Sequence, residues 1–231
     1  MSSINKIEDI IKHYPFLISV AIIFAMGIAL FAGILEEVYA KESSIINFDL
    51  SITQGIVSAR TPELNLVFLN LTNLGNALPF LTIFLFSSIL LLVYKKYISV
   101  LILSLTVLGG QILVYTIKLI IQRARPETIF ALIKEDGFSF PSGHTFIAVC
   151  FWGVLGYLVI KHFKNIYLKF LASIIFLTIV LGIGVSRVYL GVHWASDVIA
   201  SYSLATVYCI VVIFMVYRRK KLLKELTLVS K

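Results

Sequence analysis

Long apolar stretches without a charged residue constrain this chain more than any other feature of its sequence. They place spans at about 16–35, 77–94, 97–117, 144–160, 170–186 and 198–217. Each is close to the ~20 residues that a helix needs to cross ~30 Å of hydrocarbon. Only 14% of the 231 residues are charged and 59% are hydrophobic, which excludes a water-soluble fold. Because a helix satisfies its own backbone polar groups in lipid, we predict an all-α polytopic membrane protein with six transmembrane helices in a single domain, 1–231.

Two of these windows allow a second interpretation. The first follows Lys6 and Lys12 and could be a signal peptide, but its apolar core is long for a cleaved signal, so we expect a retained helix. The second extends back to about residue 64. Gly75, Asn76 and Pro79 interrupt it, and we therefore start that span at 77.

The two cysteines, Cys150 and Cys209, each lie inside an apolar window. Two cysteines are too few for a small fold held together by disulfides. We expect both to be small buried hydrophobic residues and not a bridge or a metal-binding pair.

The formal net charge of +8 is divided unevenly between the two sides of the predicted bundle. Six spans place both termini on one side, which carries thirteen basic and three acidic residues, whereas the other side carries seven basic and nine acidic residues. The positive-inside rule then predicts cytoplasmic termini in a plasma membrane. Nucleic-acid binding is disfavoured, because the basic run Arg218–Lys221 directly follows a span and suits contact with lipid headgroups.

Two longer connections, 36–76 and 118–143, are predicted to be extracytoplasmic. In the first, Ile45, Phe48, Ile52 and Ile56 recur at helical spacing, so it either lies flat at the membrane interface as a helix or forms a plain loop. On the cytoplasmic side, two histidines lie among basic residues and are expected to be solvated. They are His13 and His162.

Polar residues at the outer ends of otherwise apolar helices are the positions that point to chemistry. Ionisable groups near lipid are costly and are usually functional. The predicted topology brings these residues, from distant parts of the chain, to one depth. They are Lys118, Ser142, His144, Ser186, Arg187, His193 and Asp197.

These residue types suit a phosphate group. Lys118, Arg125 and Arg187 are three cations that can surround a tetrahedral dianion. Ser142 and Gly143 stand at a helix start, where free backbone N–H groups and the helix dipole favour an anion.

Two histidines and one carboxylate supply the reactive groups. His193 and Asp197 are four residues apart and share a helix face, so the carboxylate can hold one ring nitrogen protonated and leave the other nucleophilic. His144 comes from another helix and can act as acid and base. These residues are too few for a dedicated two-metal centre, so we expect phosphoryl transfer without a metal or other cofactor.

Taken singly, each of these residues has an ordinary structural explanation. Lys118 could snorkel to the interface, Ser142 and Gly143 could cap a helix, and Asp197 could complement a helix dipole. Arg123 is expected either to snorkel or to make a second headgroup contact. Seven such residues at one membrane face together favour a functional site.

The same residues form three motifs that resemble those of the type 2 phosphatidic acid phosphatase family, within a superfamily that includes acid phosphatases and vanadium haloperoxidases. Lys118–Pro126 reads K-x6-R-P, Phe140–His144 contains P-S-G-H, and Ser186–Asp197 reads S-R-x5-H-x3-D. The segment 71–75, LTNLG, resembles the start of the family's second helix. All three motifs are complete and in order.

The resemblance implies a role for each residue. His193 would form a phosphohistidine, Asp197 would orient it, and His144 would protonate the leaving oxygen and then activate water, without metal. The phosphoryl oxygens would be held by Lys118, Arg125, Ser142, Gly143 and Arg187.

The chain resembles most the small bacterial six-helix lipid phosphatases of the phosphatidylglycerophosphatase B and undecaprenyl-pyrophosphatase kind. Their substrates are phosphatidylglycerophosphate, phosphatidic acid and undecaprenyl pyrophosphate at the outer leaflet, and the motifs do not distinguish among them. A phosphotransferase using an acceptor other than water, and a non-catalytic lipid-binding protein, are the alternatives. A transporter is disfavoured because no ionisable residue lies at the predicted mid-bilayer.

Overall fold

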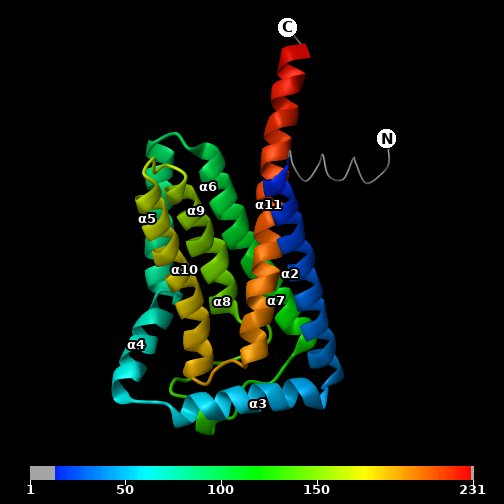
Figure 1. The fold of residues 1–231 in the computed structure, drawn as a ribbon, viewed down its shortest axis with the longest axis vertical. Helices are drawn as coiled ribbons and strands as arrows, with labels where there is room; N and C mark the ends of the chain where they lie inside the picture. Colours follow the sequence, from blue (N-terminus) through cyan, green and yellow to red (C-terminus); the bar gives the residue numbers. More distant parts are fainter. Residues whose placement is uncertain (1–13, 230–231) are drawn as a thin grey trace.

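The computed structural model describes residues 14–229, which form helices and no strand (Figure 1). The all-α prediction is therefore confirmed. The α-helices are α2 (Pro15–Ala40), α3 (Ser43–Ser58), α4 (Pro62–Asn73), α5 (Ala77–Val93), α6 (Tyr97–Ser104), α7 (Gly110–Ile121), α8 (Gly143–Ile147), α9 (Val154–Ile160), α10 (Ile166–Tyr189) and α11 (Ala195–Val229). Shorter helical segments are the π-helical η1 (Leu105–Gly109) and η3 (Ala148–Gly153) and the 3-10 turn η2 (Thr128–Phe130).

Within the described residues, five helical stretches are long and apolar enough to cross a membrane. They are Pro15–Ala40, Tyr97–Ile121, Gly143–Ile160, Ile166–Tyr189 and Ala195–Lys220. A sixth candidate consists of α4 and α5, which are bent by 47° at the break between them. This break falls where Gly75 and Asn76 interrupt the second apolar window.

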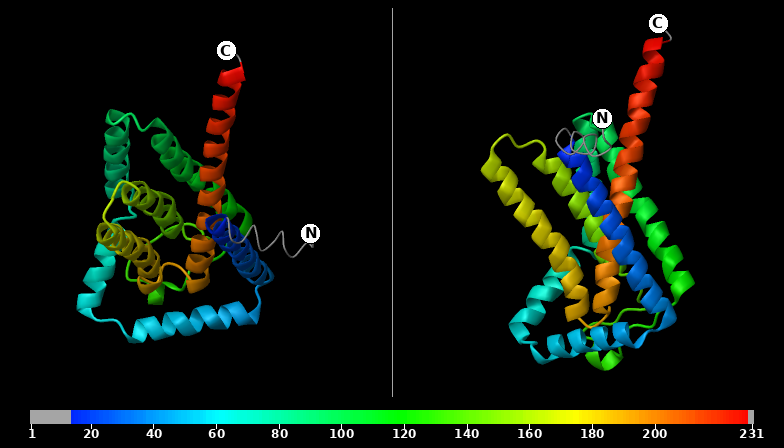
Figure 2. Two further views of the ribbon diagram at one scale, coloured as in Figure 1. Left: turned by 45° about the horizontal axis from the view of Figure 1, so that its top comes forward. Right: turned by 45° about the vertical axis from the view of Figure 1, so that its right-hand side comes forward.

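The fourth span, α8–η3–α9, lies at the centre of the bundle. More than half of its most apolar window is buried, against 6% for the peripheral helix α2. Its side chains Phe146 and Phe151 pack with Ile102 and Leu103 of α6 and Ile183 of α10. Helix α2 instead lies along α11 at the edge of the bundle, as Figures 1 and 2 show.

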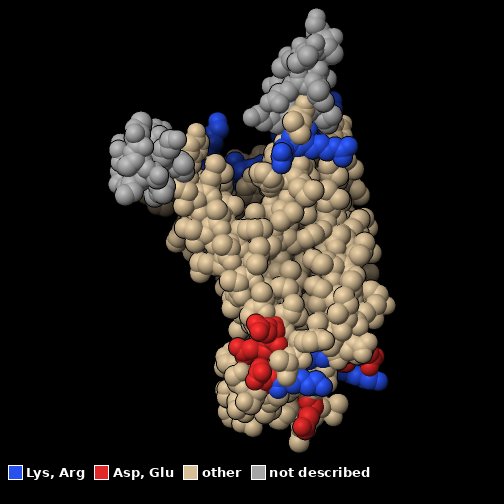
Figure 3. All heavy atoms as spheres, turned by 90° about the vertical axis from the view of Figure 1, so that its right-hand side faces the viewer, with Lys and Arg blue, Asp and Glu red and all other residues tan. Residues whose placement is uncertain are grey.

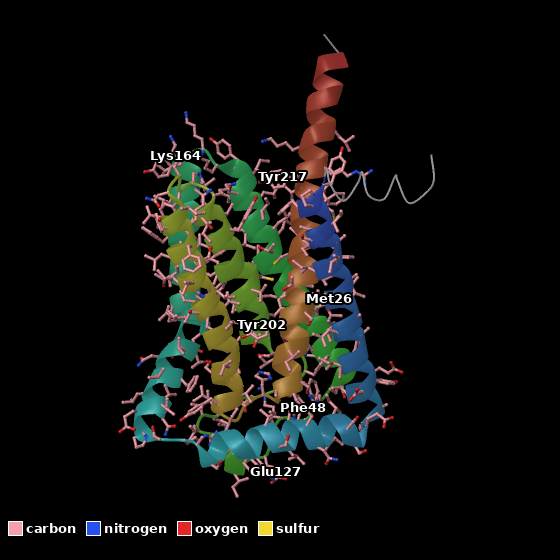
Figure 4. All side chains as sticks on the ribbon, in the orientation of Figure 1. Met26, Phe48, Glu127, Lys164, Tyr202 and Tyr217 are labelled. Carbon is pink, nitrogen blue, oxygen red and sulfur yellow. The ribbon has the colours of Figure 1, made fainter. Side chains whose placement is uncertain are left out.

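The outer surface of the bundle is apolar over its middle part. Leu78, Phe86 and Ile112 are each more than two-thirds exposed. Figure 3 shows a broad band without charged residues, with Lys and Arg at one end and charges of both signs at the other. Such a band suits the hydrocarbon of a membrane. In Figure 4, Lys164 and Glu127 mark the two opposite ends.

Helix α3 lies across one end of the bundle (Figure 1), which is the end that carries charges of both signs in Figure 3. The plain-loop alternative for this segment was therefore wrong. Its packed face contains Ile45, Asp49 and Thr53, whereas Phe48 and Ile52 of the expected apolar stripe are exposed. This packed face is partly polar because Asp49 has hydrogen-bond partners in the bundle.

The cysteine prediction is confirmed. Cys150 and Cys209 are buried and unbridged, with their sulfur atoms 3.6 Å apart. His162 is exposed, as expected, whereas His13 lies outside the described residues.

Candidate functional site

The structure brings the predicted site residues together at one end of the bundle, from four elements and the segments next to them. Lys118 is in the last turn of α7, and Arg125 follows that helix. Ser142, Gly143 and His144 begin α8, Arg187 is in the last turn of α10, and His193 and Asp197 flank the start of α11.

The centre of the site is a buried histidine–carboxylate pair. Nδ1 of His193 lies 3.4 Å from Oδ2 of Asp197. The same oxygen accepts hydrogen bonds from the Ser139 hydroxyl and from the Trp194 N–H at 3.0 Å. On the other side of the ring, Nε2 is 3.1 Å from Nη1 of Arg125. Because a guanidinium only donates, Nε2 is the acceptor and Nδ1 carries the proton that faces Asp197.

The surroundings of His193 keep its ring neutral. Burial lowers the pKa of His193 to about 4, and the neighbouring cations Arg125 and Lys118 act in the same direction, although Asp197 opposes them. At neutral pH the ring therefore has an unprotonated Nε2 directed at the cationic side of the site. Such a nitrogen is available as a nucleophile.

Two of the cations hold the connection 118–143 against the site. Lys118 donates to the carbonyls of Phe138 and Ser139. Arg125 donates to the carbonyls of Gly137 at 3.0 Å, Asp136 at 3.0 Å and Val192 at 2.7 Å. These bonds connect the first motif to the segment before the second motif and to the turn that carries His193.

Arg187 is completely buried and has one acidic partner. Its Nη2 donates to Oε2 of Glu135 at 2.5 Å and its Nη1 donates to the Thr72 hydroxyl at 2.6 Å. Its Nε has no hydrogen-bond partner within residues 14–229. A buried guanidinium needs compensating acceptors, and this one retains a donor that an anionic ligand could use.

Glu135 is a site residue that the sequence analysis missed. Its carboxylate lies 4.0 Å from Arg125 as well as 2.5 Å from Arg187. Burial alone would raise the pKa of Glu135, but the combined influence of Arg187, His144 and Arg125 lowers it. An ionised carboxylate therefore lies among the cations expected to hold phosphate. The only signal was its place in a connection between two motifs.

His144 contacts a residue outside the three motifs. Its Nε2 lies 2.9 Å from Oδ1 of Asn76, at the bend between α4 and α5. A Cβ on Gly75 would lie 3.0 Å from the His144 ring, so the glycine permits this close approach. Asn76 was not predicted to be part of the site, because Gly75 and Asn76 were interpreted only as an interruption of the second apolar window.

A groove of about 420 Å³ runs beside His144. It is lined by Gly75, Ala77, Phe80, Leu81, Gln111, Gly143, His144 and Ile147. Most of its wall is apolar, and the polar side chains in it are Gln111 and His144.

Ser142 has the capping role that was considered for it. Its hydroxyl accepts hydrogen bonds from the Thr145 N–H at 3.4 Å and from the Thr145 hydroxyl at 2.9 Å. It therefore fixes the start of α8, where His144 is the second helical residue.

The predictions for Arg123 were wrong. Instead of reaching lipid, its Nη1 donates to Oδ1 of Asp197 at 2.5 Å and its Nη2 donates to Oδ2 of Asp49 at 2.6 Å. Asp49 lies on α3 and is buried, and it belongs to none of the motifs. The sequence contained no indication that α3 would dock beside the first motif.

Among the described residues, no three His, Cys, Asp or Glu side chains are grouped so that they could hold a metal ion. The charged side chains at this site are the cations Lys118, Arg123, Arg125 and Arg187 and the carboxylates Asp49, Glu135 and Asp197.

This chain is similar in sequence and in structure to known proteins. Residues 99–221 match the PAP2 superfamily. Phosphatidylglycerophosphatase B of Bacillus subtilis (strain 168) is 34% identical over 164 residues, which is 70% of this chain and 80% of that protein.

Two solved structures are also similar. The crystal structure of a transmembrane PAP2-type phosphatidylglycerolphosphate phosphatase from B. subtilis has a TM-score of 0.72 and 31% identity, covering 84% of this chain and 96% of the other. The crystal structure of Aquifex aeolicus LpxE has a TM-score of 0.54 and 26% identity, covering 71% of this chain and 94% of the other. The similarity thus extends well beyond the motif-bearing segments.

Proposed function

Because this chain belongs to the PAP2 superfamily, we propose that it releases phosphate from membrane lipids through a covalent intermediate on His193. Its similarity to phosphatidylglycerophosphatase B indicates that the chain is a lipid phosphatase. The observation that carries the proposed mechanism is the buried His193 ring, which lies between the Asp197 carboxylate and the Arg125 guanidinium.

In the first step, Nε2 of His193 attacks phosphorus while the bond from phosphorus to the lipid oxygen breaks. His144 gives its proton to that leaving oxygen. Asp197 accepts the hydrogen bond from Nδ1 and stabilises the positive charge that forms on the ring. Lys118, Arg125 and Arg187 balance the charge on the phosphoryl oxygens.

In the second step, His144 takes a proton from a water molecule, whose oxygen attacks the phosphohistidine. The P–N bond breaks, inorganic phosphate leaves and His193 is again neutral. The low pKa of His193 suits this cycle, because the ring is neutral and nucleophilic before the attack and leaves phosphorus as a neutral imidazole.

The groove beside His144 supports a lipid substrate. A phosphate at His193 would place the leaving oxygen towards His144, and the chain attached to that oxygen would follow the apolar wall of Phe80, Leu81 and Ile147. We infer that phosphomonoesters and pyrophosphates of lipids are the substrate class. Phosphatidylglycerophosphate, phosphatidic acid and undecaprenyl pyrophosphate are the compounds to test.

The charge distribution supports an extracytoplasmic location for the reaction. The site lies at the end of the bundle that α3 crosses, opposite Lys164 (Figure 4). By the sequence, the Lys164 end carries the larger positive charge. By the positive-inside rule, the Lys164 end is cytoplasmic and the site faces outwards.

The test is a phosphate-release panel on the purified full chain in lipid nanodiscs. The panel compares the three lipids with a water-soluble phosphomonoester, and it includes His193→Ala and His144→Ala. We expect release from at least one lipid, loss of release in both variants, and an acid-labile phosphoprotein that His193→Ala lacks. Wild-type rates in the two correctly inserted variants would refute the mechanism.

A further inference from the structure

A network of polar side chains at positions that the three motifs do not specify reaches the histidine–carboxylate pair from α3. Asp197 uses its two oxygens differently: Oδ2 faces His193, and Oδ1 accepts from Arg123 at 2.5 Å. Arg123 extends its other nitrogen to Asp49 at 2.6 Å. One guanidinium thus bridges two buried carboxylates, a geometry for which the planar fork of arginine is suited.

Asp49 also holds the beginning of α11. Its Oδ1 accepts from the Ser196 N–H at 2.9 Å and its Oδ2 accepts from the Ser196 hydroxyl at 2.6 Å. Ser196 is the second residue of α11, so its N–H is one of those that the helix itself leaves unpaired. A side chain of α3 therefore caps the helix whose third residue is Asp197.

The Asp49–Arg123 contact and the capping of α11 by Asp49 both restrict the Asp197 side chain. Its Oδ2 accepts from the Trp194 N–H, which fixes the carboxylate against the start of its own helix. With Arg123 on Oδ1 and the helix start fixed by Asp49, the carboxylate has one orientation in which Oδ2 faces the ring. Neither Asp49 nor Arg123 contacts His193.

We propose that Asp49 and Arg123 are positioning residues of this site, which hold the Asp197 carboxylate and the start of α11 in the orientation that His193 requires. The inference rests on the proposed function, in which the His193–Asp197 pair forms the covalent intermediate. It extends the machinery from the three motifs to α3, a helix across the end of the bundle (Figure 1).

The test uses the full chain in nanodiscs with Asp49→Asn, Arg123→Gln and the double variant. Because neither residue contacts the predicted phosphate ligands, we expect kcat to fall by roughly 10- to 100-fold while KM changes by less than about threefold. Since Asp49 and Arg123 act on the same carboxylate within one network, the double variant should lose less than the product of both single losses.

A second readout separates positioning from a general loss of structure. The groups that face His193 are Asp197, Ser139, Arg125 and Lys118, and neither substitution alters any of these four residues chemically. Arg123→Gln removes a cation beside Asp197 and should raise the pKa of His193. Asp49→Asn leaves Arg123 less compensated and should lower it. Carbon-13 NMR titration of labelled histidine, with His193→Ala for assignment, measures both shifts.

The matched control is Thr53→Val, one turn along the same packed face of α3. The Thr53 hydroxyl is buried without a hydrogen-bond partner within the described chain, so valine preserves the packing and should leave kcat and the His193 titration unchanged. Arg123→Lys, which keeps one positive charge but cannot bridge both carboxylates, should behave like Arg123→Gln in kcat.

The outcomes are distinct. Wild-type kcat and an unchanged His193 titration in Asp49→Asn and Arg123→Gln would overturn the inference. So would shifts of the same sign in both variants, or an equal loss in Thr53→Val. If the wild type released no phosphate from any lipid, the proposed function would fail, and the opposite pKa shifts would still decide whether the network acts on His193.

Discussion

Gly191 occupies the tightest backbone position near the site and allows a quantitative prediction. It has φ +72°, and a Cβ at this residue would lie 2.0 Å from the carbonyl oxygen of Phe130. Gly191→Ala should therefore displace the Phe130 segment by more than about 1 Å, since heavy atoms in contact stay above about 3 Å.

The expected loss in the free energy of unfolding follows from the hydrogen bonds near this contact. Phe130 O accepts from Arg60 at 2.8 Å, and the next segment is tied by the Leu132 N–H to the Leu190 carbonyl at 2.9 Å. A left-handed alanine costs about 1–2 kcal/mol. Loss of one charged and one neutral hydrogen bond adds about 2–4 kcal/mol, so the free energy of unfolding should fall by about 3–6 kcal/mol.

The assay is thermal unfolding of the purified protein in detergent, together with phosphate release. A loss of this size should lower the unfolding midpoint by at least roughly 6 °C. Activity of the folded fraction should also fall, because His193 is two residues away. The control is Gly33→Ala in α2, where a Cβ would meet nothing within 4 Å. A midpoint for Gly191→Ala as high as that of Gly33→Ala would refute the reasoning.

Three further predictions concern the chemistry of the site. Because the pKa of His193 is lowered to about 4, its ring stays neutral at pH 5.5, where an ordinary histidine is only about one-tenth neutral. The neutral nucleophile should therefore be lost only as the pH falls through about 4. An NMR titration midpoint near 6.5 for His193 would contradict this. Glu135→Gln removes the anion beside Arg187 and Arg125, so inorganic phosphate should inhibit more strongly, by roughly fivefold for a partly exposed carboxylate. An unchanged inhibition constant would count against the Glu135 carboxylate and phosphate lying beside the same cations. Phosphate release should continue in excess EDTA, since the proposed steps use only side chains of the chain; loss that a divalent cation restores would disprove this.

Much of the fold could be predicted because charge is scarce in this chain. Uncharged windows located the helices, and the same scarcity made Lys118, Arg187 and His193 conspicuous at their ends. Their convergence follows from the membrane itself, which aligns helix ends at one depth.

The residues that were missed come from segments whose position depends on tertiary packing. Asp49 reaches Arg123, and through it Asp197, because α3 turns across the bundle. Glu135 reaches Arg187 because Arg125 and Lys118 hold its connection in place. Single acidic residues in such segments have no periodicity that would mark them. Arg123 was misread for the same reason, because both of its partners are distant in sequence.

The groove beside His144 has a consequence for how the enzyme encounters its substrate. Its wall is mostly apolar. Under the proposed function, the tails of a lipid bound there stay in hydrocarbon, so the enzyme should meet its substrate by lateral diffusion in the membrane. The rate should then depend on the number of substrate molecules per unit area of bilayer, not on the amount in the tube. Diluting the substrate with inert lipid should slow turnover, whereas adding buffer to the same vesicles should leave turnover per enzyme unchanged.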